Sequence, residues 1–226
     1  MLLTDIILFS IVTVVTSRTL STTPTPYHCC WSPVKVNKFR MIGGKVDPKT
    51  SIPEAVEYSG INYRDHNIKK AIMFRDVPQP DGSVRKEIEY SDYNTMKWYV
   101  ISEGVCTEHI IKYPMPDHCV PPNATYTGDT VLGEEGYPQV RLHNYNLDWI
   151  DFRGYNIRIS TDARTCDTMT ETDYGDIDGA KAVYTYFFSD HVSHIDDYSI
   201  FDIPVPCRHF VSGSKNSQNV LFMYKL

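Results

Sequence analysis

Apolar and polar residues alternate in short runs along most of this chain, which is the pattern of β-strands. The runs are rich in Val, Ile, Thr, Tyr and Phe, and turn-forming Gly, Pro, Asn or Asp residues separate them. The pattern predicts strands over 36–42, 56–63, 69–74, 84–90, 96–101, 109–112, 147–152, 155–160, 181–188, 198–203 and 220–224. Prolines exclude long helices from the central third, and residues 174–183 are the segment with the most helical character. We therefore predict a mainly β protein with few short helices.

The run over residues 181–188 is the clearest of these strands. Alternation places Tyr184, Tyr186 and Phe188 on one face and Val183 and Phe187 on the other. Both faces are apolar, as expected for a strand with a core on one side and a cavity or a dimer partner on the other.

The first residues have a different pattern, because residues 1–17 are mostly apolar and end in small residues. The run is too short to span a bilayer comfortably, so it predicts a cleaved signal peptide, with a buried N-terminal helix as the alternative. No later run is long enough for a membrane span. Residues 18–28 are rich in Thr and Pro, which predicts a flexible leader. We expect residues 29–226 to form a single domain that is secreted and extracellular.

Export gives the cysteines a structural meaning. In an oxidising compartment they are most simply three disulfides, formed among Cys29, Cys30, Cys106, Cys119, Cys166 and Cys207. Spacing alone leaves 15 connectivities open, and no Cys-x-x-Cys pair favours zinc. Asn123 begins an N-glycosylation sequence, and Pro121 and Pro122 before it favour an exposed, extended loop.

Charge narrows the choice of partners. The formal net charge is −6, which argues against a nucleic-acid partner and against general attraction to anionic lipids. Acidic residues gather between 161 and 202, where only Arg164 and Lys181 oppose them. Carboxylates on extracellular loops suit Ca²⁺, the only cofactor that the pattern suggests. The densest group is Asp173, Asp176 and Asp178, for which a solvated acidic face is the alternative.

The sequence contains none of the motifs that would predict an enzyme. It lacks a Gly-x-Ser-x-Gly nucleophile motif, a His-Glu-x-x-His zinc motif, a dinucleotide-binding glycine motif and a phosphate-binding loop. His191 and His194 would lie on opposite sides of a strand, which disfavours a metal pair. We therefore predict a non-enzymatic protein.

Three motifs together resemble the ependymin and ependymin-related family. They are Cys30-Trp-Ser-Pro33, the block from Cys119 to Thr125, and Pro204 to Cys207. The resemblance implies two curved antiparallel sheets, a β-sandwich that forms a half-open barrel similar to bacterial lipoprotein carriers. It also implies a deep apolar cavity and a homodimer. The candidates for the cavity wall are Trp98, Trp149, Phe152, Tyr184, Tyr186 and Phe188.

The resemblance also implies a disulfide pairing. The vertebrate members suggest Cys30 with Cys166 and Cys106 with Cys207, and the remaining Cys29 and Cys119 would form an extra pair of the invertebrate type. Because Cys29 and Cys30 are adjacent, an exchange of their partners is the main alternative.

Two functional hypotheses follow. The first is a secreted, disulfide-bonded glycoprotein that binds an apolar or lipid ligand in its cavity. The second is a calcium-binding glycoprotein of the extracellular matrix or of cell adhesion, without a small-molecule ligand. A large apolar cavity would favour the first, and converging surface carboxylates would favour the second.

Overall fold

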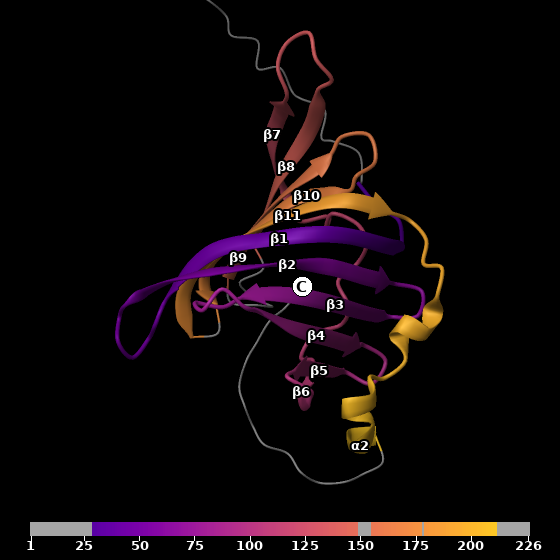
Figure 1. Cartoon of the computed structure of the whole chain (residues 1–226). Coiled ribbons are helices and arrows are strands. Elements are labelled where there is room, and N and C mark those ends of the chain that lie inside the picture. Colours follow the sequence, from indigo (N-terminus) through magenta and orange to yellow (C-terminus); the bar gives the residue numbers. More distant parts are fainter. Residues whose placement is uncertain (1–28, 149–154, 178, 212–226) are drawn as a thin grey trace, which may run out of the picture.

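A computed structural model describes residues 29–148, 155–177 and 179–211 of the chain (Figure 1). Among these residues, no helix is long and apolar enough to cross a membrane. The strands are β1 (Val34–Val46), β2 (Pro53–Asp65), β3 (Lys70–Pro78), β4 (Val84–Asp92), β5 (Lys97–Ser102), β6 (Val105–Ile110), β7 (Thr125–Leu132), β8 (Val140–Asp148), β9 (Tyr155–Asp162), β10 (Thr168–Ile177) and β11 (Ala180–Val192). They are followed by η1 (Tyr198–Phe201), η2 (Val205–Cys207) and α2 (Arg208–Val211).

The described strands form one antiparallel sheet in the order β6-β5-β4-β3-β2-β1-β11-β10-β9-β8-β7. Strands that are neighbours in the sequence pair within two meanders, β1–β6 and β7–β11, and the pairing of β1 with β11 joins the two. β6 and β7 form the two edges, so the sheet is not closed. The predicted mainly β, antiparallel and open architecture is confirmed, and the two expected sheets are the two halves of one continuous sheet.

Two local predictions are wrong. The described residues of the range 174–183 are not helical, because 174–177 end β10 and 180–183 begin β11, with Gly175 and Gly179 at φ +130° and +80°. Residues 198–203 are not a strand. Asp197 caps a 3₁₀ turn there by accepting a hydrogen bond from the backbone nitrogen of Ser199 at 2.9 Å, and the apolar residues of this segment pack against the sheet.

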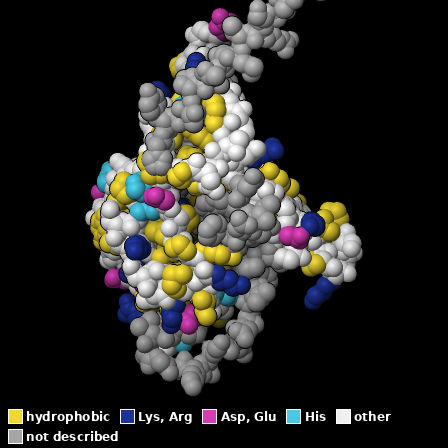
Figure 2. All heavy atoms as spheres, turned by 180° about the vertical axis from the view of Figure 1, so that it is seen from behind, with side chains coloured by type: hydrophobic (Ala, Val, Ile, Leu, Met, Phe, Trp, Pro, Cys, Tyr) yellow, Lys and Arg dark blue, Asp and Glu magenta, His cyan; other side chains and the backbone are white. Residues whose placement is uncertain are grey.

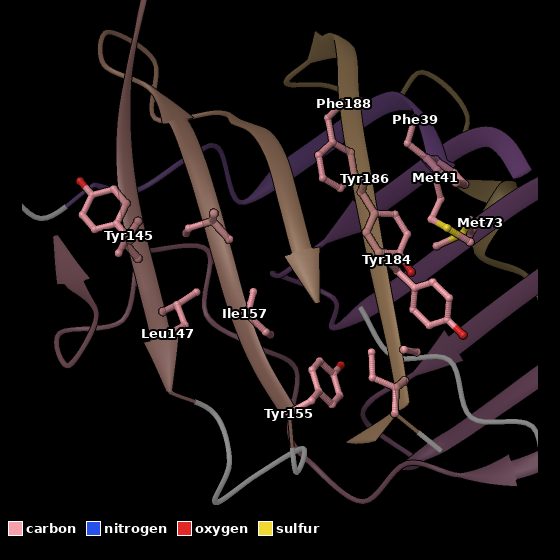
Figure 3. Packing of buried hydrophobic residues seen from close by; sticks show 14 of the residues in the cluster. Phe39, Met41, Met73, Tyr145, Leu147, Tyr155, Ile157, Tyr184, Tyr186 and Phe188 are labelled. Atoms are coloured by element: carbon pink, nitrogen blue, oxygen red, sulfur yellow. The ribbon is translucent and has the colours of Figure 1, made fainter. Parts of the chain in front are cut away.

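The sheet curves around a cluster of buried residues on what we call its inner face. This cluster combines residues of the first meander, such as Met41 and Met73, with residues of the second, such as Tyr145 and Leu147. Figure 3 shows the β11 side chains Tyr184, Tyr186 and Phe188 in a row beside Phe39 and Met41, with Leu147 on β8 and Ile157 on β9.

The opposite, outer face of the first meander is covered by the segment 193–211 after β11. Ile195, Phe201 and Cys207 pack there with residues of β3 to β6. The hydroxyl of Tyr90 donates to the carbonyl oxygen of Phe201 at 3.0 Å, and the Cys106–Cys207 disulfide fixes this segment to β6.

Residues 111–124, which connect the edge strands β6 and β7, lie over the inner face, and we call them the strap. Cys119 of the strap bonds to Cys30, and Cys29 bonds to Cys166 in the turn before β10. The backbone nitrogen of Trp31 donates to His118 at 2.9 Å, and that of Val120 to Cys29 at 2.8 Å. The N-terminal segment and the strap are therefore held together above the inner face.

The disulfide prediction is corrected at two cysteines. Cys29 bonds to Cys166 and Cys30 to Cys119, the reverse of the predicted assignment, whereas Cys106–Cys207 agrees with it. Successive side chains of an extended segment point to opposite sides. Cys29 points into the inner cluster, where its Sγ lies 3.6 Å from Thr161 Oγ1, and the more exposed Cys30 faces the strap.

Candidate ligand pocket

A pocket of about 90 Å³ lies on the inner face, where the first meander meets the second beneath the strap. The strap contributes Pro116, Asp117, Cys119 and Pro121, and Trp31 stands beside them. The pocket is therefore bounded by segments that are distant in the sequence and are tied to one another by two disulfides.

One wall of the pocket is apolar and comes from the second meander. Leu147, Ile157, Ile159 and Phe188 line it, and all four are buried in the inner cluster. Their strands alternate so that every second side chain turns inward, which gives β8, β9 and β11 a continuous apolar inner face.

The facing wall is polar and comes from β1 and β2. Lys35 lies directly opposite Arg64 in the β1–β2 ladder, and Asn37 lies opposite Asn62. The ammonium of Lys35 lies 3.2 Å from Asp167, and burial lowers the pKa of Lys35 to about 8 in spite of this carboxylate. Apolar and polar groups therefore meet in one small volume, which suits an amphipathic ligand.

The predicted cavity residues are only partly brought together. Phe188 lines the pocket, and Tyr184 and Tyr186 lie in the same cluster. The hydroxyls of Tyr58 and Tyr186 are 3.1 Å apart, and burial raises the pKa of Tyr186. The ring of Trp98 lies tilted against that of His109, with 4.6 Å between the ring centres, and Trp98 does not belong to the cluster. Trp149 and Phe152 lie outside the described residues.

The predicted calcium ligands do not converge. Asp173 is buried on the inner face of β10, whereas Asp176 is exposed and forms an ion pair with Lys181. Residues three apart on a strand point to opposite faces, and Asp178 lies outside the described residues. In the described part of the chain, one group of potential metal ligands comes together, Asp117, His118 and Cys119, but the disulfide occupies Cys119. Calcium binding stays a prediction.

Asn123 is exposed in a turn that follows Pro121 and Pro122. This placement suits an N-linked glycan, and glycosylation also stays a prediction.

A wider and more open hollow of about 870 Å³ lies between the β3–β4 turn and the β5–β6 turn. Exposed turn residues such as Asp81 and Glu103 form its walls. No buried polar atom without a partner lies among its lining residues in the described structure. We therefore place the candidate site at the smaller pocket. Seen from behind (Figure 2), the visible hydrophobic side chains lie in patches between charged and histidine side chains.

The family model for ependymin matches residues 85–207, and no curated protein matches. The similar solved structures include an uncharacterized conserved protein from Thermus thermophilus (4% identity, 74% of this chain and 86% of that one, TM-score 0.42). They also include a LolA superfamily protein from Nitrosomonas europaea, with 8% identity, coverage of 75% of this chain and 90% of that one, and a TM-score of 0.34. A third is a putative outer membrane lipoprotein-sorting protein domain from Vibrio parahaemolyticus, with 8% identity, coverage of 74% of this chain and 88% of that one, and a TM-score of 0.33. Likeness at this level does not bear on function.

Proposed function

This chain belongs to the ependymin family, and from that premise we propose that it is a secreted, non-enzymatic protein that binds an apolar or lipid ligand on the inner face of its sheet. The observation that carries the proposal is the pocket beneath the strap, where Leu147, Ile157, Ile159 and Phe188 offer an apolar wall to a ligand. Secretion is supported by the cysteines, because none of them is free and disulfides persist in oxidising compartments.

The size of the pocket sets a condition on binding. Sites for small molecules usually have volumes of ~300–1,000 Å³, and this pocket has about 90 Å³. An acyl chain therefore requires the strap to move outward from the apolar wall when the ligand enters. Segment rearrangements of this kind occur in a minority of binding proteins. Each CH₂ group that is then buried contributes ~0.8 kcal/mol.

Tryptophan fluorescence offers a direct test, because Trp31 lines the pocket whereas Trp98 lies on β5, outside the inner cluster. Delipidated protein is titrated with a fatty acid that carries bromine atoms in its chain, which quenches tryptophan at close range. We expect saturable quenching in the natural protein, loss of most of it in Trp31→Phe, and little change in Trp98→Phe.

The two variants also define the result that would contradict the proposal. Quenching that is absent in the natural protein, or that is equal in both variants, would place no acyl chain beside Trp31. Native mass spectrometry of the same samples shows any lipid retained from expression and reads the oligomeric state, since the homodimer also stays a prediction. A protein that carries no lipid would leave the calcium-dependent adhesion role as the alternative.

A further inference from the structure

The polar wall of the pocket contains two buried acceptors that no donor satisfies. Asn37 and Asn62 are 3% and 5% exposed, and they face each other across the β1–β2 ladder. The Oδ1 atom of each has no hydrogen-bond partner, and both residues line the pocket. Buried polar groups are nearly always paired in native proteins, because an unpaired one is destabilising. Two such acceptors side by side would be satisfied by donors from a group bound in the pocket.

An unpaired donor lies next to them. Arg64 follows Asn62 by two residues on the same face of β2, and its Nε is buried without a hydrogen-bond partner. Among the described residues no carboxylate forms an ion pair with Arg64, whereas the neighbouring Lys35 is paired with Asp167. Three residues that line the pocket thus each hold an unpaired polar atom, an acceptor in Asn37 and in Asn62 and a donor in Arg64.

These groups select a hydroxyl over a carboxylate. A hydroxyl donates one hydrogen bond and accepts others, so a pair of hydroxyls can serve both Asn oxygens and the Arg64 Nε–H. An ionised carboxylate only accepts, so it would leave both Asn oxygens unpaired. It would also meet Glu171 and Asp117, which line the same pocket, while the ammonium of Lys35 there is already paired with Asp167.

The volume limits the size of the head group. About 90 Å³ corresponds to roughly three water molecules at ~30 Å³ each, which is room for a few non-hydrogen atoms and not for a sugar ring. We propose that Asn37, Asn62 and Arg64 bind the hydroxyl groups of a neutral amphiphile whose glycerol-sized head fills the space that is already open, and that its acyl chain lies against the apolar wall once the strap has moved outward. This inference rests on the proposed function and names the ligand class of that site.

The test compares two ligands with the same chain length, 1-monodecanoylglycerol and decanoate, by calorimetric titration of the delipidated full-length protein. The natural protein should bind the monoacylglycerol at least about tenfold more tightly. Asn37→Leu and Asn62→Leu should each weaken that binding about tenfold, which corresponds to ~1.4 kcal/mol, and should change decanoate binding by less than about twofold.

The matched control is Asn146→Leu, because Asn146 lies on the outer face of β8 between the inner-face residues Tyr145 and Leu147. It should leave both affinities unchanged. Melting curves verify folding, and the two inner-face variants should melt at or above the natural temperature because each removes an unpaired buried acceptor.

Two results would overturn the inference while the proposed function stands. One is equal or tighter binding of decanoate, which would point to recognition of an acid by Arg64. The other is unchanged monoacylglycerol binding in both Asn variants, which would mean that water alone serves these oxygens. Failure of both ligands, together with the absence of Trp31 quenching, would instead remove the proposed function.

Discussion

The two meanders of the sheet differ in their outer faces, although both contribute residues to the inner cluster. In the first meander, the outer face is apolar and is covered by the segment 193–211, while the inner face carries charged residues such as Arg75 and Glu89. In the second meander, the inner face is apolar, and Val183 and Phe187 are 50% and 45% exposed on the outer face. The ligand pocket forms where these two inner faces meet, which is why one of its walls is polar and the other apolar.

The inner charges of the first meander depend on one another. Arg75 lies 2.8 Å from Glu87 and 2.6 Å from Glu89, and its guanidinium lies 5.1 Å from the centre of the Tyr58 ring. Burial raises the pKa of Glu89 in spite of Arg75. Such a network fills the inside of a curved sheet at a cost in desolvation that apolar side chains would avoid. The inner face of this meander is therefore not an ordinary core.

Removal of the Cys106–Cys207 bond should have the largest effect on the cover of the first meander's outer face. Cys207 is the fully buried residue by which the segment 193–211 is bonded to β6, and the bond closes a sequence separation of 101 residues. In the chain-entropy description a loop of this length contributes ~4–5 kcal/mol. We expect Cys106→Ala/Cys207→Ala to lose about that much free energy of unfolding in urea titrations.

The Cys30–Cys119 bond is the control for this loss, because its separation of 89 residues gives nearly the same entropy. If Cys106→Ala/Cys207→Ala loses more free energy of unfolding than the control, the excess measures how far the packing of the segment 193–211 depends on the Cys106–Cys207 bond. Equal losses would show that the segment 193–211 stays in place by packing alone.

Substitution of two phenylalanines tests whether a covered outer face contributes more to stability than an open one. Phe201 is 3% exposed on the outer face of the first meander, and Phe187 is 45% exposed on that of the second. Phe201→Ala should lower the free energy of unfolding by ~3–5 kcal/mol through loss of buried area and a residual cavity. Phe187→Ala should change it by less than ~0.5 kcal/mol. Losses of similar size would mean that a partner covers the outer face of β11 in solution.

The pH dependence of stability tests the buried charge at Lys35. Its pKa is lowered to about 8 by burial, from 10.5 in the unfolded chain. Between these values the unfolded chain holds a proton that the folded protein has lost, so stability should rise with pH in this window. Relative to Lys35→Met, the natural protein should gain on the order of 2 kcal/mol between pH 8 and 10. A constant difference across this range would show that Lys35 stays charged in the fold.

The smallest effect is expected at Asn123, on the exposed turn of the strap. If this residue carries a glycan, Asn123→Gln should lower the mass of the secreted protein and change the free energy of unfolding by less than ~0.5 kcal/mol. An unchanged mass in the variant, apart from the substitution itself, would show that the site is unused.

The alternation along the chain predicts β1 to β5, β9 and β11 together with the phase of β11, but it misses β7 and β10 and overlaps β8 only at Leu147 and Asp148. Tyr184, Tyr186 and Phe188 do share one buried face, with Val183 and Phe187 on the other. The curvature and the open edges were implied only by the family resemblance, because the pairing of β1 with β11 joins segments that no local pattern connects.

The polar wall could not be predicted for a related reason. In β1, Val34 and Val36 alternate with Lys35 and Asn37, so the local pattern suggests that the valines face the core of the protein. They do become partly buried, but against the segment 193–211 on the outer face. The face that a strand turns to the pocket thus depends on residues at the other end of the chain. The same limit applies to Cys29 and Cys30, whose partners depend on which of them points toward the inner cluster.

The pairing of β1 with β11 also sets an order for biosynthesis. The first meander pairs only strands that are adjacent in sequence, so it can form by successive hairpins while the chain is still being made. Its first strand keeps an open edge until β11 has been synthesised. Cys30 can meet Cys119 once the strap has emerged, whereas Cys29 must wait for Cys166 and Cys106 must wait for Cys207. During that interval Cys29 can react with Cys119 in place of its neighbour, and thiol–disulfide exchange must reverse this bond before Cys29 can pair with Cys166.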